Sequence, residues 1–121
     1  MKKQKELPRG KSIYDLQAEI CSALASPVRL KILDILGEGE KNSSDLLEEL
    51  QIPKANLSQH LSVLKDAGIL HTRKEGLFQY VSLALPKVKD ACSLVRNILS
   101  EKMAMDEEKN SKLMKELRAK K

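Results

Sequence analysis

The chain has 121 residues, which suits one domain with a modest core that needs no disulfides or metals. Its 22 Lys and Arg exceed its 17 Asp and Glu by five, mainly at the two ends, and residues 1–11 are expected to form a flexible basic arm. No apolar run is long enough to span a membrane or to form the core of a signal peptide. The two cysteines cannot form a disulfide framework, so we expect a cytoplasmic protein. With one Phe, two Tyr and no Trp, the composition argues against a stacking platform for single-stranded nucleic acid.

The starting residues of the first two helices are recognisable. Ser12 with Asp15 is a short-acid form of the capping box, and apolar residues follow at helical spacing. Ser26-Pro27 then supplies an N-cap and a first-turn proline for a second helix. That helix is apolar on too many sides for a surface position, so we expect it to be central and buried, and to end at Gly37.

The next two helices are separated by a tight connection. Asn42 or Ser43 can cap the third helix, and three leucines supply its apolar side. Residues 51–53 connect it to a fourth helix, predicted over residues 54–67. Gly68 then takes the position just past the helix end, where glycine is favoured.

After Gly68 the apolar period changes from that of a helix to that of strands. Residues 69–74 and 77–83 are two β-prone runs, and Glu75-Gly76 between them predicts a tight hairpin turn. Pro86 opens a last helix with coiled-coil-like apolar spacing. The sequence therefore predicts a mainly α fold with a small β-hairpin wing, a winged helix-turn-helix of order α-α-α-α-β-β-α. Its domain covers residues 12–105, and residues 106–121 form a charged helix extension or a tail.

One helix and the hairpin carry the candidate function. The fourth helix can pack inward through Ala55, Leu57, Leu61, Leu64 and Ala67. Its other side is small and polar, with a single carboxylate at the far end, and can enter a DNA major groove, where Asn and Gln read adenine and Ser can serve any base. Arg73 and Lys74 can contact phosphates beside the adjacent minor groove. The predicted DNA-binding residues are Lys54, Asn56, Ser58, Gln59, His60, Ser62, Arg73 and Lys74.

Three segments resemble the ArsR/SmtB repressor family. Residues 24–33 (LASPVRLKIL) are similar to its opening motif, residues 57–70 (LSQHLSVLKDAGIL) to its recognition helix and exit, and Arg73-Lys74-Glu75-Gly76 followed by Tyr80 to its wing. The resemblance covers residues 13–99 and implies a homodimer in which the first and last helices pair across a two-fold axis. It also implies a repressor that binds an inverted repeat in double-stranded DNA and is released by a small signal.

The resemblance also suggests roles for single residues. It makes Asn56, Ser58 and Gln59 base readers. His60 could bond a phosphate, bond the backbone or tune binding with pH, and a metal role is disfavoured. Arg29 is either an ion-pair former with a buried stem or a phosphate contact.

The metal sites of metal-sensing relatives have no counterpart here. One such site uses two cysteines and an aspartate at the third helix, where this chain has Asn42-Ser43-Ser44-Asp45. A second uses carboxylates and histidines on the last helix, which here offers Asp90 and Glu101 but no histidine. We therefore expect neither a metal nor another cofactor.

Cys21 on the first helix and Cys92 on the last leave three interpretations open. They can be small packed hydrophobes, a redox-sensitive thiol pair, or ligands of a metalloid. Thiol-sensing relatives place one cysteine in the second helix, where this chain has Asp34, so the analogy is incomplete.

The sequence disfavours two other functional classes. No phosphate loop, nucleophile elbow or paired catalytic histidine occurs, so we do not expect an enzyme. A winged helix can also be a protein-interaction module, but such a surface should expose apolar anchors rather than a polar, cationic set. We therefore expect double-stranded DNA and a second copy of the chain as partners, and no membrane.

Overall fold

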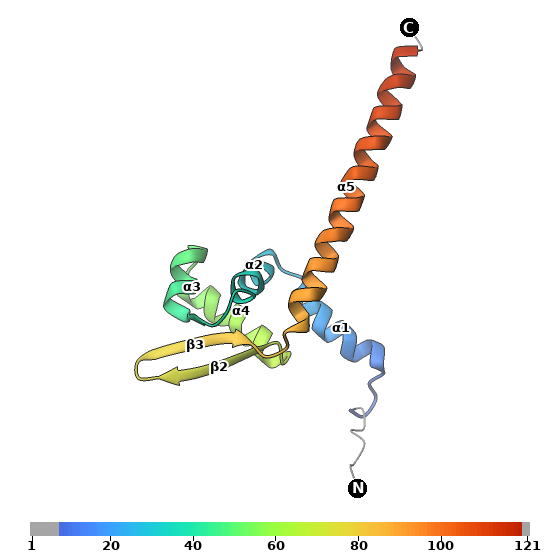
Figure 1. Cartoon of the computed structure of the whole chain (residues 1–121). Coiled ribbons are helices and arrows are strands. Elements are labelled where there is room, and N and C mark those ends of the chain that lie inside the picture. The colour runs from blue at the N-terminus through green and yellow to red at the C-terminus, as the bar shows by residue number, and fades with distance from the viewer. Residues whose placement is uncertain (1–7, 120–121) are drawn as a thin grey trace. The chain divides into compact units, whose positions relative to one another are not determined.

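The computed structural model describes residues 8–119, so most of the predicted basic arm lies outside the described residues. The helices are α1 (Ile13–Leu24), α2 (Pro27–Leu36), α3 (Ser43–Leu50), α4 (Lys54–Asp66) and α5 (Lys87–Ala119). The strands are β1 (Lys41–Asn42), β2 (Leu70–Glu75) and β3 (Phe78–Leu83), and β2 and β3 form a hairpin beside the helices (Figure 1). The predicted winged helix-turn-helix fold is confirmed.

The predicted helix starts are also confirmed. Ser12 caps α1 through a reciprocal box, in which its hydroxyl accepts from the Asp15 backbone N–H and the Asp15 carboxylate accepts from the Ser12 N–H. Ser26 caps α2, which has Pro27 in its first turn. Asn42, the first of the two candidates, caps α3 by accepting from the Ser44 N–H.

The end of α4 fixes the direction in which the chain enters the hairpin. Gly68 has φ +77°, a left-handed conformation that favours glycine. Its N–H donates to the Lys65 carbonyl, and the Ile69 N–H donates to the Leu64 carbonyl, which together form a Schellman motif. Leu64 and Ile69 are both fully buried, so the two residues joined by this motif also lie in the apolar core.

The sheet has one strand more than predicted. β1 pairs antiparallel with β3, and β3 pairs antiparallel with β2, so β3 is central. The hairpin turn lies at Gly76-Leu77, one residue later than predicted, because Glu75 pairs with Phe78. Gly76 has φ +62° at the first central position, as a type II′ turn requires. Strand β1 is only two residues long, too short to give a periodic signal in the sequence.

Five elements contribute to one core. Its fully buried side chains are Ile32, Leu46, Leu64, Ile69 and Val81. They come from α2, α3, α4, the segment after α4, and β3. Burial of each such side chain is worth about 1.5–3 kcal/mol, so this core holds the three helices and the hairpin together.

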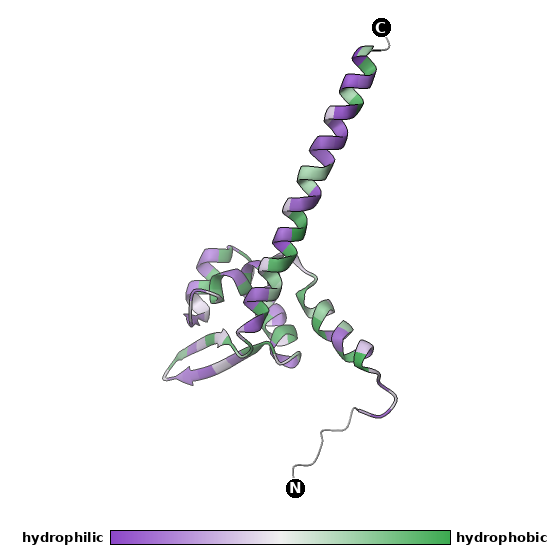
Figure 2. Ribbon diagram, turned by 45° about the vertical axis from the view of Figure 1, so that its right-hand side comes forward, coloured by the Kyte–Doolittle hydropathy of each residue, from purple (hydrophilic) through white to green (hydrophobic). Residues whose placement is uncertain are grey.

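The chain divides into two units, residues 1–88 and 89–121. The second unit is the continuation of α5, in which hydrophobic residues alternate with hydrophilic ones (Figure 2). Its large apolar side chains, Leu94, Val95 and Ile98 among them, are more than half exposed. Within residues 8–119, no helix is both long and apolar enough to cross a membrane.

Candidate nucleic-acid interface

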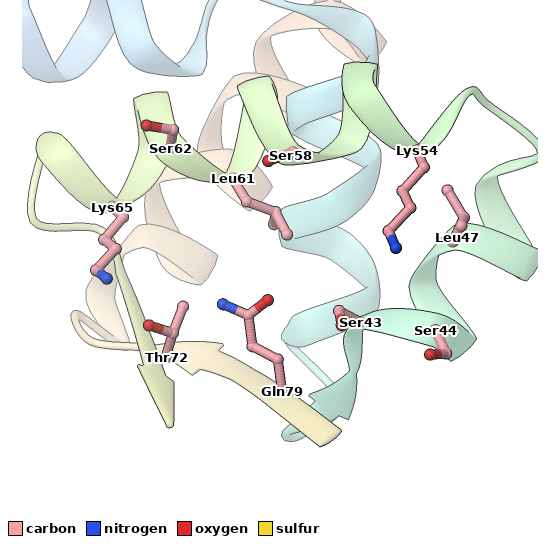
Figure 3. Close-up of a pocket in the computed structure, with 10 residues that line it drawn as sticks. All are labelled: Ser43, Ser44, Leu47, Lys54, Ser58, Leu61, Ser62, Lys65, Thr72 and Gln79. Carbon is pink, nitrogen blue, oxygen red and sulfur yellow. The ribbon is translucent and has the colours of Figure 1, made fainter. Parts of the chain in front are cut away.

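A groove of about 320 Å³ lies between α3, α4 and the hairpin (Figure 3). Helix α4 forms one wall, the start of α3 another, and β2 and β3 the side opposite α4. Its lining residues are Ser43, Ser44, Leu47, Lys54, Ser58, Leu61, Ser62, Lys65, Thr72 and Gln79.

Helical periodicity explains which α4 residues reach the groove. Lys54, Ser58, Ser62 and Lys65 follow one another at intervals of four, four and three residues, and therefore form a single stripe along the helix. The buried leucines of α4 lie beside this stripe and face the core. Ala55, which we expected to pack inward, is exposed. It precedes the buried Leu57 by two residues, or about 200° around the helix, and so lies on the far side.

The groove is chemically suited to an anion. It contains the two ammonium groups of Lys54 and Lys65, five hydroxyl groups and the amide of Gln79, and none of its lining residues is a carboxylate. Figure 3 shows the Gln79 amide directed toward α4 from the strand side and the Lys54 side chain directed into the space from above. Hydroxyl, amide and ammonium donors are the groups by which proteins bind DNA phosphates.

The six predicted DNA-binding residues of α4 therefore do not share one face. Lys54, Ser58 and Ser62 line the groove, and Gln59 is exposed outside it. Asn56 is also exposed but lies about 200° around the helix from Ser58, on the same flank as His60 four residues later. Lys65, which belongs to the exposed polar side predicted for this helix but not to the predicted DNA-binding residues, also lines the groove. Ser43, Ser44, Thr72 and Gln79 were not predicted, because their place in the groove depends on packing.

Arg73, the predicted phosphate contact of the hairpin, is already paired with carboxylates. Its Nε and Nη2 donate to the two carboxylate oxygens of Glu40 at 3.0 and 2.7 Å, and its Nη1 donates to Glu75 at 2.7 Å. The guanidinium also lies 4.4 Å from the centre of the Tyr80 ring. Hydrogen bonding to Arg73 lowers the pKa of Glu40, so this carboxylate stays ionised at neutral pH. A phosphate would have to compete with two carboxylates for Arg73.

Lys74 lies on the other face of the hairpin. Side chains alternate between faces along a strand, so Lys74 shares its face with Thr72, which lines the groove, whereas Arg73 points to the opposite side. Lys74 pairs across the hairpin with Gln79, also a groove residue. Its exposed ammonium group therefore extends the basic surface of the groove toward the hairpin tip.

His60 and Arg29 contact each other across α4 and α2. The Arg29 Nη1 lies 3.2 Å from the His60 Nδ1, and both residues are half-buried. The Arg29 Nε donates to the Ala23 carbonyl at 2.6 Å, and Nη2 donates to the Ser22 carbonyl at 3.4 Å. Arg29 thus binds the end of α1 and a histidine of α4, an arrangement that neither sequence interpretation of this residue anticipated.

The two cysteines are accessible to different degrees. Cys21 is exposed on α1, and Cys92 is half-buried on α5. Packing within a single chain therefore does not bury Cys21. Among residues 8–119, no three His, Cys, Asp or Glu side chains converge in a way that could hold a metal ion.

Comparison with known proteins identifies the family. The sequence model described as "Bacterial regulatory protein, arsR family" matches residues 26–72, from the cap of α2 into β2. An uncharacterized HTH-type transcriptional regulator of Methanocaldococcus jannaschii is 39% identical over 83 residues, which are 68% of this chain and 93% of that protein. The chain belongs to the ArsR family. Its members matched here are transcriptional regulators, so this chain is an ArsR-family regulator with a winged helix-turn-helix fold.

Two further relatives of this ArsR-family chain are a repressor and a homodimeric DNA-binding domain. The transcriptional repressor SdpR of Bacillus subtilis is 32% identical over 82 residues, covering 68% of this chain and 91% of SdpR. A solution structure of a homodimeric winged helix-turn-helix DNA-binding domain from Mycobacterium bovis superposes with a TM-score of 0.68 at 31% identity. That comparison covers 84% of this chain and 92% of the other.

Proposed function

We propose that this ArsR-family chain is a homodimeric repressor that binds an inverted-repeat operator through α4 and the wing, residues 69–83. The observation that carries the proposal is the carboxylate-free groove beside the exposed polar side of α4. In this arrangement the outer side of α4, with Gln59, enters the major groove and reads base edges.

The lining of the groove suggests how the DNA backbone lies. The DNA strand that separates the DNA major groove from the next minor groove passes between α4 and the wing. Lys54 and Lys65 are 11 residues apart in α4, or about 16 Å along the helix axis, so they bind different phosphates. Ser58 and Ser62 lie between them and also face this strand. They therefore contact phosphates, and base reading from α4 depends mainly on Gln59.

The first and last helices support the proposed dimer. Ile13 and Tyr14 of α1 are 60% and 78% exposed, and Leu94, Val95 and Ile98 of α5 are each more than 60% exposed. Exposed apolar side chains on each of these helices favour association. A second copy that covers both helices would present two copies of α4 about 34 Å apart, one turn of DNA.

Paired variants test the assignment. Gln59→Ala should reduce the preference for the operator over random duplex, because it removes a base contact. Lys65→Ala should weaken binding to both duplexes alike and lower the salt slope by about 0.9, because it removes one phosphate contact. Fluorescence anisotropy on the DNA upstream of the chain's own gene measures both. Failure of the wild-type chain to bind any duplex would favour a protein-interaction module instead.

We further propose that the release signal is thiol-directed. Cys21 is exposed on α1, a helix of the proposed dimer interface. Hydrogen peroxide is a suitable probe: two thiols form a disulfide and lose two electrons and two protons, and the peroxide is reduced to water. Loss of DNA affinity that dithiothreitol restores and Cys92→Ser abolishes is the expected result. Release by arsenite alone would identify a metalloid-responsive repressor, and binding unchanged by either reagent would contradict both roles.

A further inference from the structure

Arg29 joins three helices through one side chain. Its backbone N–H donates to the Ser26 hydroxyl at the start of α2. Its guanidinium reaches back to the last turn of α1, at Ala23 and Ser22, and across to His60 of α4. The guanidinium therefore fixes α4, the helix proposed to read DNA, relative to the end of α1.

This contact determines which nitrogen of the neutral His60 ring carries the proton. An arginine can only donate hydrogen bonds, so the His60 Nδ1 that faces Arg29 must accept and carries no proton. The proton of the neutral imidazole is then on Nε2.

The Nε2–H group is available to a ligand. No hydrogen bond joins the His60 Nε2 to another residue within 8–119. No buried side-chain nitrogen or oxygen in the described residues lacks a partner, so Nε2 reaches the surface. It does so on the helix that carries Lys54, Ser58 and Lys65.

We propose that Arg29 is a positioning residue that fixes His60 as the neutral Nε2–H tautomer, so that Nε2–H donates to a phosphate of the bound DNA. The proposal rests on the proposed DNA-binding function. It adds a contact to the DNA backbone on the flank of α4 that does not line the groove. It also adds Arg29 as the residue that orients this contact.

The tautomer can be measured without DNA. Long-range ¹H–¹⁵N correlation spectra at about pH 8.5, two units above the ordinary histidine pKa of about 6.5, should show His60 with a bare Nδ1 and a protonated Nε2. His71, exposed on β2, is the internal reference and should average between tautomers. In Arg29→Met, the His60 ring should also average between the two tautomers. Averaging at His60 in the wild-type chain would overturn the proposal.

Two substitutions at His60 separate the roles of its nitrogens. His60→Asn keeps an acceptor near the Nδ1 position but has no donor at Nε2, whereas His60→Gln places an amide N–H near Nε2. We expect His60→Asn to weaken binding to operator and random duplex about tenfold, since a hydrogen bond to a charged acceptor is worth about 1.5 kcal/mol or more. The salt slope should stay unchanged because a neutral donor displaces no counterion. His60→Gln should retain more affinity.

Two controls distinguish loss of the proposed contact from loss of folding. Circular dichroism melts identify any variant that is unfolded, and Arg29→Lys keeps the positive charge and the apolar stem while losing the simultaneous contacts. Arg29→Lys should share the tautomer averaging and the affinity loss. Wild-type affinity in His60→Asn would contradict the phosphate contact. If the wild-type chain binds no duplex but His60 is a fixed Nε2–H tautomer, the proposed function fails and the role of Arg29 in fixing His60 stands.

Discussion

At the scale of single residues, the position of a charge along the sequence is a poor guide to what the charge contacts. Arg73 and Lys74 are neighbours and both were predicted to bind phosphate. Strand alternation separates them: Lys74 shares the groove face, whereas Arg73 lies against Tyr80 and two carboxylates. Glu40 is 33 positions from Arg73 in the sequence, so only the fold places this pair together.

Glu40→Gln should increase the affinity for DNA of any sequence. The substitution removes the carboxylate that binds Arg73 with both oxygens, which frees the Arg73 Nε and Nη2 for a phosphate and steepens the salt slope by about 0.9. Arg73 keeps the Glu40 pKa below its ordinary value, so the wild-type pair stays ionised at every neutral pH used for binding. Glu38→Gln is the matched control, because it changes net charge equally at an exposed residue close by. Equal effects in anisotropy titrations would show that Arg73 is not released.

At the scale of elements, caps and turns position the proposed interface. The Schellman motif at Gly68 ends α4 and directs the chain into β2, and Gly76 closes the hairpin with a left-handed backbone. Both glycines could be predicted as breaks, since glycine is the residue that such conformations favour. The exact turn residues could not, because a one-residue shift in register depends on how β3 pairs with β1 as well as β2.

Gly68→Ala should lower the free energy of unfolding by about 1–2 kcal/mol, the cost of a left-handed conformation for an L-residue. Open space surrounds the position of the added Cβ, so backbone conformation accounts for the whole effect. Gly68→Asn should cost less, because asparagine tolerates this conformation better. Urea denaturation followed by circular dichroism measures both, and equal stability of Gly68→Ala and wild type would contradict the argument.

At the scale of the whole molecule, exposed apolar surface is the main feature that one chain leaves unexplained. Helix α5 has 33 residues, and its large apolar side chains are exposed from Leu94 to Leu117. A single helix of this kind gains its stability from packing an apolar face, so a partner is expected. The proposed homodimer provides that partner.

Leu94→Glu combined with Ile98→Glu should therefore convert the dimer to a monomer. Operator affinity should fall roughly 100-fold or more, since two linked half-site contacts become independent ones. Sedimentation equilibrium gives the oligomeric state and anisotropy gives the affinity. The matched control is Leu113→Glu combined with Leu117→Glu, two positions within the predicted 106–121 segment. Dimers in both double variants would place the interface elsewhere.

The sequence alone determined the helices, their caps, the hairpin and the polar character of α4, because these depend on periodicity and on the local chemistry of Ser, Pro, Asn and Gly. It also carried the motifs of the ArsR family. Only the tertiary structure decided that Lys65, Thr72 and Gln79 share one groove, that Arg73 is paired with Glu40, and that Arg29 binds His60. These partners come from different elements, and their approach is set by the packing of the common core, which has no local signal in the sequence.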